Sequence, residues 1–565
     1  MADTTYGLRR PARRARWLRR LALVALTAAL LPVVAIPAVK AGTSRQGAGA
    51  GSPASRCSVG YLAPALHESG VTVDSAVLDT TGSFTAPYTT TPITGLPDFC
   101  AVDLTETDSA GNPMHTVVWL PEKWNGRFEG IGGGGFSCGI FYSPSPGYVL
   151  PSLSQTIESG YAAASTDCGV PEADTYTGSW ALEPDGKLDQ PLINDYASAG
   201  IHDMTVLGKA VTGAFYPGRI EDSYFVGCST GGREALDEAQ QYPDDYNGIV
   251  AGAPAVNLPR MVFADLWPAL VMNQMHDALP ACKEDAFTSV AVAACQGGDG
   301  VDDGIISNPA DCHWNADELI GVSTPCGTIT AADAAVMNKI LQGPATASGK
   351  SLWYGLEPGA SLSSIAATTT ANGVTTPSPF SISVGWLGTW LQENPGWNWQ
   401  TLTYAQFDKL FAQSTREFDS ILASDSPDLT AFKEHGGKLL IWQGLADPLA
   451  FPQATTQYYR EVQQTMGGAA STSAFARLFL APGASHCGSG AGPAPTAAGP
   501  VTAVANWVQH GKAPKSILAT MTDPAPPTLT RPVCAYPLQA RYIGHGNTNQ
   551  ARNFRCTRAP SAWHS

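Results

Sequence analysis

One stretch of the chain reads Tyr224-Phe225-Val226-Gly227-Cys228-Ser229-Thr230-Gly231-Gly232-Arg233-Glu234-Ala235-Leu236. Its core, residues 227–231, fits the G-x-S-x-G pattern, in which a serine occupies a strained bend between a strand and a helix. Glycines are needed on both sides because side chains would collide there, and the bend exposes the serine hydroxyl. The pattern also arises by chance in a chain with 58 glycines. The apolar run before it and the helix-forming residues after it favour Ser229 as a nucleophile.

The length and charge of the chain limit the classes of protein to which it can belong. Its 565 residues exceed one ordinary domain, so we expect a large core fold with a substantial insertion or a second domain. The net charge of −15 argues against nucleic acid or an anionic membrane as a partner. The acidic residues are dispersed, and a solvated surface explains most of them.

The N-terminal segment has the pattern of a secretory signal peptide. A basic region is followed by an apolar run over residues 21–36. Pro32 interrupts this run, which is shorter than a typical transmembrane helix. We predict a signal peptide over residues 1–41, a linker over residues 42–56, and a secreted protein without a membrane partner after cleavage. A retained anchor is the weaker alternative, because a Gly/Ser/Ala-rich segment follows at once. Disulfides are the default for the twelve cysteines of an exported chain.

Strand and helix patterns alternate through the first half of the chain. Buried strands are predicted over residues 115–121 and 124–131, and the second ends in a run of four glycines, residues 132–135. Such a run lets backbone N–H groups approach a ligand, so we predict that Gly133 and Gly134, with the N–H of Thr230, stabilise an oxyanion. A flexible turn is the alternative. Further strands at 161–165 and 246–255, with helical segments at 152–160 and 193–215, predict a parallel α/β sheet.

The alternation stops after residue 255 and resumes near residue 429. We therefore predict a core over residues 57–255 and 429–565, with a lid domain inserted over residues 256–428. The predicted lid is rich in aromatic residues, which suit a flat aromatic substrate, although packing within the lid is the likelier role for most of its tryptophans, Trp386, Trp390, Trp397 and Trp399.

An acid and a histidine each follow a predicted strand in the resumed core. Asp447 comes after the strand at 438–444, and His486 comes after the strand at 476–480. The order Ser229, Asp447, His486 is that of α/β-hydrolases. Ser229 would attack an acyl carbonyl, His486 would transfer the protons, and Asp447 would orient the imidazole.

Two cysteines flank the predicted nucleophile and base. Cys228 precedes Ser229 and Cys487 follows His486, so one disulfide between them would tie the two loops together. Disulfide geometry holds the paired Cα atoms within about 7 Å. This would bring Ser229 and His486 into reach of each other.

The chain resembles the tannase and feruloyl esterase family, which also contains mono(hydroxyethyl) terephthalate hydrolases. The resemblance covers most of the mature chain and is carried by residues 227–233, 242–254, 446–448 and 482–488. It implies an α/β-hydrolase core with a large inserted lid, catalysis by Ser229, Asp447 and His486, no organic cofactor, and a small aromatic ester or plant cell-wall phenolic ester as substrate.

The resemblance also implies disulfides and a structural Ca²⁺ loop in the lid. With the cysteine spacing, it implies the pairs Cys57–Cys100, Cys295–Cys312 and Cys534–Cys556 beside the Cys228–Cys487 clamp, which leaves Cys138–Cys168 and Cys282–Cys326. Carried over position by position, the calcium ligands are Gln296, Asp299, Val301, Asp303 and Ile305. Glutamine stands where the family has an acid, so we expect weaker binding; the alternative is a metal-free turn.

These observations predict a secreted serine carboxylesterase for aromatic carboxylic esters. One alternative is an esterase or depolymerase for another acyl group. The other is a non-catalytic carbohydrate or cell-wall binding protein on a hydrolase scaffold, which is disfavoured because all three triad residue types are in place.

Overall fold

A nine-stranded sheet forms the centre of the fold in this computed structural model, which describes residues 51–66, 70–108, 110–145, 148–149, 151–171, 174–346, 348–490, 492–521 and 528–558. The strands follow the order β1-β4-β5-β7-β6-β8-β9-β14-β15. Their bounds are β1 Val71–Asp79, β4 Phe99–Thr107, β5 Pro113–Pro121, β6 Arg127–Ile131, β7 Ala162–Thr166, β8 Asp222–Cys228, β9 Gly248–Gly252, β14 Lys438–Gly444 and β15 Ala476–Ala481.

The sheet has an antiparallel part and a parallel part. Strands β1, β4 and β5 pair antiparallel in sequence, and β5 also runs antiparallel to β7. The six strands from β7 to β15 are parallel to one another. Every residue of β7 and of β9 is buried, as expected for parallel strands covered on both faces. The carboxyl ends of β8, β14 and β15 therefore meet at one edge of the sheet.

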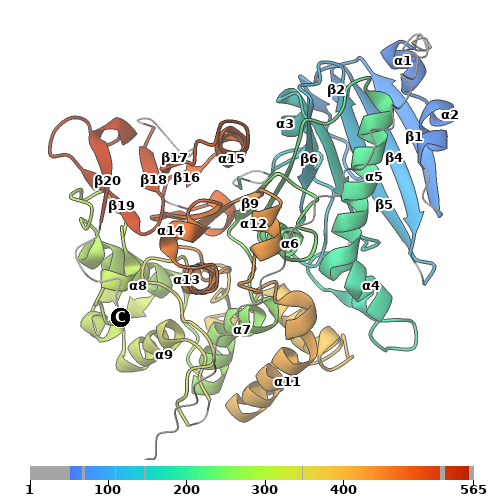
Figure 1. The fold of residues 1–565 in the computed structure, drawn as a ribbon. Helices are drawn as coiled ribbons and strands as arrows, with labels where there is room; N and C mark the ends of the chain where they lie inside the picture. The colour runs from blue at the N-terminus through green and yellow to red at the C-terminus, as the bar shows by residue number, and fades with distance from the viewer. Residues whose placement is uncertain are drawn as a thin grey trace, which may run out of the picture. The chain divides into compact units, whose positions relative to one another are not determined.

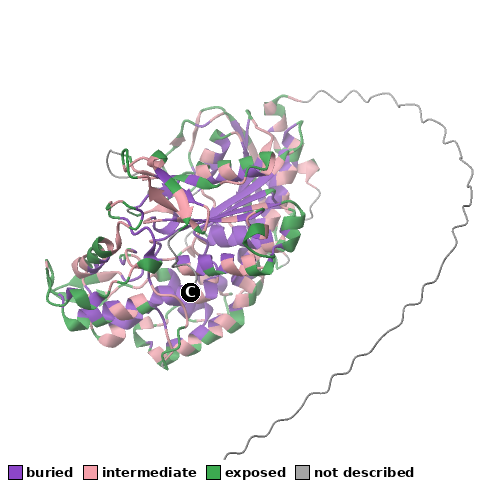
Figure 2. Ribbon diagram, turned by 60° about the vertical axis from the view of Figure 1, so that its left-hand side comes forward, coloured by how far each residue is buried: buried purple, intermediate pink, exposed green. Residues whose placement is uncertain are grey.

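Helices cover both faces of this sheet (Figure 1). Helices α5 (Gly200–Phe215) and α6 (Thr230–Gln241) pack on one face, and α3 (Leu153–Glu158) and α15 (Ala498–His510) pack on the other. The alternation along β7 shows this, because Ala162 and Ala164 share a core with Leu207 of α5, whereas Ala163 packs with Leu153 of α3. Figure 2 shows the sheet as the buried centre of the fold. The predicted α/β-hydrolase core is confirmed, but the sheet is mixed and not wholly parallel, because β1, β4 and β5 run antiparallel.

The region between β9 and β14 is mainly helical. Its longer helices are α7 (Leu258–Met275), α8 (Ala281–Cys295), α9 (Ala331–Gln342) and α11 (Tyr404–Leu422). Trp386 and Trp390 are almost fully buried and stack on each other, with ring centroids 4.9 Å apart. Both rings also stack on Phe136, which follows the glycine run, so this region packs directly on the core. The role and boundaries predicted for a lid stay predictions.

The end of the chain forms two small sheets. Strands β16 (Ala494–Pro495), β17 (Ser516–Thr520) and β18 (Thr530–Cys534) form one, and β19 (Leu538–Tyr542) pairs with β20 (Phe554–Arg558). All six predicted disulfides are confirmed, namely Cys57–Cys100, Cys138–Cys168, Cys228–Cys487, Cys282–Cys326, Cys295–Cys312 and Cys534–Cys556.

The predicted signal peptide lies outside the described residues. At the end of the predicted linker, Pro53–Arg56 form the short helix α1, which Ser52 caps; the bounds of the linker stay a prediction. Within the part of the chain that the structure describes, no helix has the length and apolar character needed to cross a membrane.

Candidate active site

Ser229 lies in the bend between β8 and α6. Its backbone has φ 65° and ψ −121°, a strained conformation for a residue with a side chain. A Cβ atom on Gly227 would lie 2.2 Å from the carbonyl oxygen of Gly231, and one on Gly232 would lie 2.4 Å from that of Gly252. The glycines are therefore required by the close approach of α6 to the neighbouring backbone. The bend has the form that the sequence predicts.

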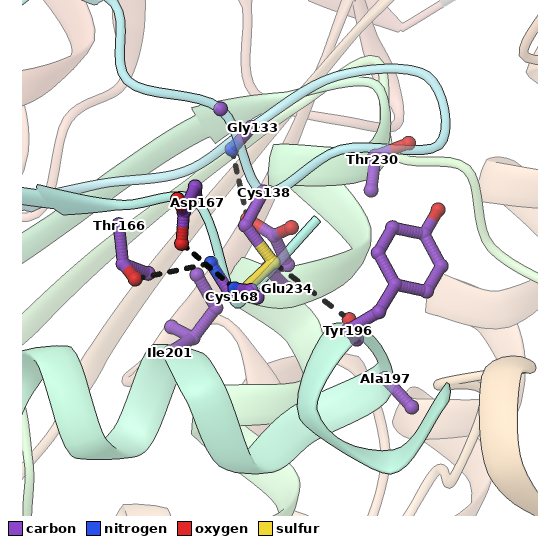
Figure 3. Close-up of a disulfide and its surroundings, with 12 residues drawn as sticks. Gly133, Cys138, Thr166, Asp167, Cys168, Tyr196, Ala197, Ile201, Thr230 and Glu234 are labelled. Atoms are coloured by element: carbon purple, nitrogen blue, oxygen red, sulfur yellow. Dashed lines mark hydrogen bonds between the residues drawn. A yellow bond between two sulfur atoms is a disulfide. The ribbon is translucent and has the colours of Figure 1, made fainter. Parts of the chain in front are cut away.

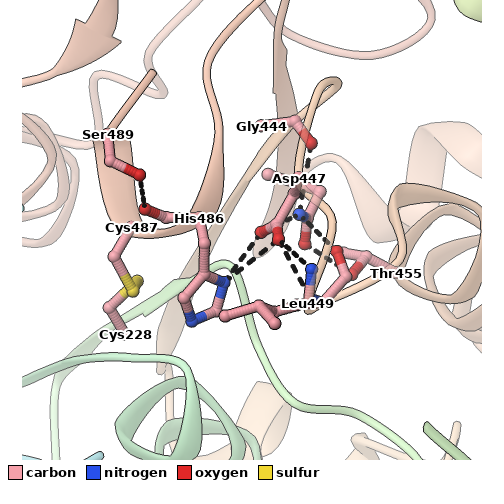
Figure 4. Close-up of polar contacts among 10 residues, drawn as sticks. Cys228, Gly444, Asp447, Leu449, Thr455, His486, Cys487 and Ser489 are labelled. Atoms are coloured by element: carbon pink, nitrogen blue, oxygen red, sulfur yellow. Dashed lines mark hydrogen bonds and ion pairs between the residues drawn. A yellow bond between two sulfur atoms is a disulfide. The ribbon is translucent and has the colours of Figure 1, made fainter. Parts of the chain in front are cut away.

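Asp447 and His486 form a buried pair beyond β14 and β15 (Figure 4). His486 Nδ1 lies 3.1 Å and 3.0 Å from the two carboxylate oxygens of Asp447. Asp447 is fully buried, and it also accepts hydrogen bonds from the N–H groups of Leu449 and Ala450 and from the side-chain amide of Gln443, each at 2.9–3.0 Å. These donors fix the carboxylate and compensate its burial. The imidazole is thereby oriented with Nε2 left for another partner.

The Cys228–Cys487 disulfide links the elbow to the histidine loop. Its Cα atoms lie 5.9 Å apart although the two residues are 259 positions apart in sequence. Because Ser229 and His486 are the adjacent residues, the bridge holds them near each other. Within the described residues no hydrogen bond joins the Ser229 hydroxyl to His486. In free enzymes this contact is often loose and tightens when substrate binds.

The predicted oxyanion donors differ in their availability. The N–H of Thr230 has no acceptor among the described residues. The N–H of Gly133 donates to the carboxylate of Glu234 at 2.9 Å, and that of Gly134 donates to the carbonyl of Ser137 at 2.9 Å. The role of the two glycines stays a prediction, because each N–H would have to exchange its acceptor for an oxyanion.

Asp265 of α7 is a buried carboxyl that the sequence analysis did not single out. It is fully buried, and within the described part of the chain neither carboxylate oxygen has a hydrogen-bond partner. Burial, and secondarily the charge of Asp447, raises the pKa of Asp265 well above its usual range. Burial without a hydrogen-bond donor therefore favours the neutral form of the Asp265 carboxyl group. No local sequence pattern marks this residue.

The predicted calcium ligands lie in one loop that Cys295–Cys312 closes. The side chains of Asp299, Asp303 and Gln296 accept hydrogen bonds from the loop N–H groups of Val301, Ile305 and Gly304, respectively. Burial raises the pKa of Asp299 against the hydrogen bond from Val301, and the charge of Asp303 adds to the rise.

This set of donors suits Ca²⁺, but Gln296 in place of an acid gives the set one negative charge fewer. All the donors are oxygens, as a hard cation requires. Asp303, however, also forms an ion pair with Arg531 of β18, which is 5% exposed. Among the described residues, no three His, Cys, Asp or Glu side chains come together as a metal cage. Sequence reasoning missed Arg531, which is 228 residues from its partner.

The chain is similar over most of its length to known proteins. A family model described as tannase and feruloyl esterase matches residues 102–557. A probable feruloyl esterase of Arthroderma benhamiae is 41% identical over 470 residues, which cover 82% of this chain and 86% of the relative. A probable feruloyl esterase B-1 of Aspergillus oryzae is 27% identical over 487 residues, which cover 82% of this chain and 85% of the relative.

Solved structures share the fold. Feruloyl esterase B from Aspergillus oryzae superposes with a TM-score of 0.76 at 23% identity, over 90% of this chain and all of that one. Tannin acyl hydrolase from Aspergillus niger superposes with a TM-score of 0.77 at 23% identity, over 90% of this chain and 97% of that one.

Proposed function

Because the chain belongs to the tannase and feruloyl esterase family and is a carboxylic ester hydrolase, we propose that it is a secreted serine esterase for esters of phenolic carboxylic acids. Family membership sets aside the non-catalytic binding protein. The observation that carries the serine mechanism is the buried Asp447–His486 pair beside a disulfide that ends next to Ser229. Three loops from different parts of the sheet thereby converge.

In the proposed mechanism Ser229 Oγ attacks the acyl carbonyl carbon. His486 Nε2 accepts the serine proton and then donates it to the leaving alkoxide, which departs as the alcohol. Asp447 stabilises the imidazolium through Nδ1. Water then attacks the acyl-enzyme, again with His486 as base, and releases the carboxylic acid. The N–H of Thr230, which has no acceptor in the part of the chain that the structure describes, supports a role in stabilising the oxyanion.

The proposed location rests on the cysteines. Twelve cysteines in six bridges suit an oxidising compartment and argue against the reducing cytosol. Expression with residues 1–41 intact should yield a mature protein that begins after Ala41. Retention of that segment on the exported protein would contradict the predicted cleavage.

Covalent labelling tests the mechanism, and a substrate panel tests the specificity. A p-nitrophenyl phosphonate should inactivate the enzyme with one adduct, which peptide mapping should locate on Ser229. The panel contains methyl ferulate, methyl gallate, mono(hydroxyethyl) terephthalate and p-nitrophenyl acetate. We expect the aromatic acyl esters to be preferred by kcat/KM. Labelling elsewhere overturns the assignment of Ser229, and preference for the short aliphatic ester favours the alternative acyl specificity.

We also propose that the loop around Asp299 and Asp303 binds Ca²⁺ as a structural ion. Both carboxylates, the amide oxygen of Gln296, and the carbonyls of Val301 and Ile305 are the residues that would hold it. The ion would supply charge neutralisation within the loop and no chemistry at Ser229.

A further inference from the structure

The glycine loop, residues 132–136, is attached to the elbow helix through a buried glutamate. Glu234 lies on α6, five residues after Ser229. Its carboxylate Oε2 accepts the Gly133 N–H at 2.9 Å (Figure 3). The carbonyl oxygen of Gly133 accepts the N–H of Gly231 at 3.0 Å. Both polar backbone groups of Gly133 are therefore bound to the helix that begins at the nucleophile.

The glycine loop is closely packed against Glu234 and the first turn of α6. A Cβ atom on Gly132 would lie 2.7 Å from Glu234 Oε2 and 2.8 Å from the Gly231 Cα. The loop backbone thus packs directly against the carboxylate and the first turn of α6. A residue of different length at position 234 would either leave a gap or displace the loop.

The far end of the glycine loop is held by other groups. The carbonyl oxygen of Gly135 accepts the hydroxyls of Thr230 at 2.7 Å and Tyr196 at 2.8 Å. Phe136 then stacks on Trp390, with ring centroids 5.6 Å apart. Near its start, by contrast, Glu234 is the side chain that bonds the loop backbone.

Burial of a carboxyl group to accept one backbone N–H costs free energy of desolvation. Glu234 is 1% exposed, and its other oxygen, Oε1, has no hydrogen-bond partner among the described residues. Burial raises the pKa of Glu234 to about 7, against the charge of Arg233 and the hydrogen bond from Gly133. An apolar side chain would avoid this cost of desolvation. Packing alone therefore does not account for a carboxyl group here.

We propose that Glu234 is a positioning residue that fixes the glycine loop relative to Ser229 and so shapes the oxyanion site around the Thr230 N–H; while Glu234 holds it, the Gly133 N–H is not available to the oxyanion. Glu234 does not touch the substrate, and it acts through the backbone of Gly133. Displacement of the loop would weaken interactions made in the transition state more than those made with bound substrate. The inference rests on the proposed serine mechanism.

Paired variants at position 234 test this role. Glu234→Leu removes the acceptor, and we expect kcat on methyl ferulate to fall about 10²-fold with KM changed less than about threefold. Glu234→Gln keeps an acceptor oxygen and should retain kcat within about threefold. Glu238→Leu is the matched control, because Glu238 lies on the same helix, is equally buried and, among the described residues, makes no hydrogen bond to the glycine loop. It should leave kcat unchanged.

Several outcomes overturn the proposal. One is a Glu234→Leu enzyme with parental kcat, and another is equal loss of kcat in Glu234→Leu and Glu238→Leu. A Glu234→Gln enzyme as poor as Glu234→Leu also contradicts it. If Glu234→Leu does not fold, Glu234→Asp takes its place, since the shorter acid keeps its charge but withdraws from Gly133 and should lose kcat. A fully active Glu234→Asp enzyme would then refute the role.

Failure of this inference is distinguishable from failure of the serine mechanism. If phosphonate labels Ser229 while Glu234→Leu keeps its kcat, only the positioning role fails. If phosphonate labels another residue, the mechanism fails and the inference fails with it.

Discussion

Two disulfide-linked regions of the molecule hold a carboxylate through different partners. At the proposed catalytic edge, Cys228–Cys487 joins segments 259 residues apart, and Asp447 is bound by His486 and by donors from its own loop. In the loop that Cys295–Cys312 closes over 17 residues, Asp303 accepts the N–H of Ile305 from its own loop and also pairs with the distant Arg531. The first arrangement leaves one imidazole nitrogen free for chemistry. In the second arrangement, the guanidinium of Arg531 already pairs with the carboxylate of Asp303. Asp447 is fully buried and Asp303 is partly buried; the first carboxylate has an imidazole as its partner, which fits the proposed catalytic role, and the second has a guanidinium, which fits a structural role.

Removal of Ser229, the proposed nucleophile, should give the largest effect and tests whether the edge that carries Asp447 and His486 is catalytic. Ser229→Ala should leave a folded protein whose kcat on methyl ferulate falls by at least about 10⁴-fold, because the covalent step is lost. Circular dichroism and thermal melting are the controls for folding. Activity within a few-fold of the parent would show that another residue is the nucleophile.

The acid should come next. Asp447→Asn should lower kcat by about 10³- to 10⁴-fold, since an amide favours the wrong imidazole tautomer. Asp425→Asn and Asp428→Asn are matched controls from the segment before β14, and both should stay active. An active Asp447→Asn enzyme together with an inactive control variant would transfer the role to the other acid.

The disulfide clamp should have an intermediate effect. Cys228→Ala and Cys487→Ala should each lower kcat/KM by about 10²-fold, because the base is no longer held at the nucleophile. The double variant should be no worse than either single variant, since all three lack the same covalent tie. Additive losses would mean that the cysteines act separately. Cys534→Ala, which breaks a disulfide between β18 and β20, is the control for loss of a bridge.

The smallest effect should come from the loop around Asp299 and Asp303, which we propose binds Ca²⁺ as a structural ion. EGTA should lower Tm by about 2–4 °C and spare activity at low temperature, because the ion stabilises only the folded loop. Gln296→Asp restores an acid and should tighten Ca²⁺ binding in calorimetric titration, whereas Asp302→Asn, outside the ligand set, should not change it. Absence of calcium by elemental analysis, with no shift of Tm in millimolar Ca²⁺, would leave a metal-free turn.

Local patterns predict the parts of the fold in which neighbours in sequence are neighbours in space. The strands that became β5, β7, β8, β14 and β15 are apolar runs that end in glycine or in a polar turn, so their positions and the edge that carries Ser229, Asp447 and His486 follow from the sequence. The helices between β9 and β14 did not follow, because their apolar residues pack against distant elements.

Partners that lie far apart in the chain explain the remaining omissions. Arg531 bonds an acid 228 residues away, and Glu234 bonds a glycine 101 residues away. In neither case does the separation in sequence predict the partner. Asp265 could not be predicted either, because no local sequence pattern marks it and its carboxylate has no hydrogen-bond partner among the described residues.

The Cys228–Cys487 bridge also closes a covalent ring. The whole segment from Ser229 to His486, including all the helices between β9 and β14, lies within that ring. A single proteolytic cut inside the ring, at an exposed turn such as Gly373, would open the circle without separating the two fragments. The serine and the histidine would then sit on different polypeptides that remain joined through sulfur. Such a nicked enzyme would run as one species on a gel until a reducing agent released its two halves.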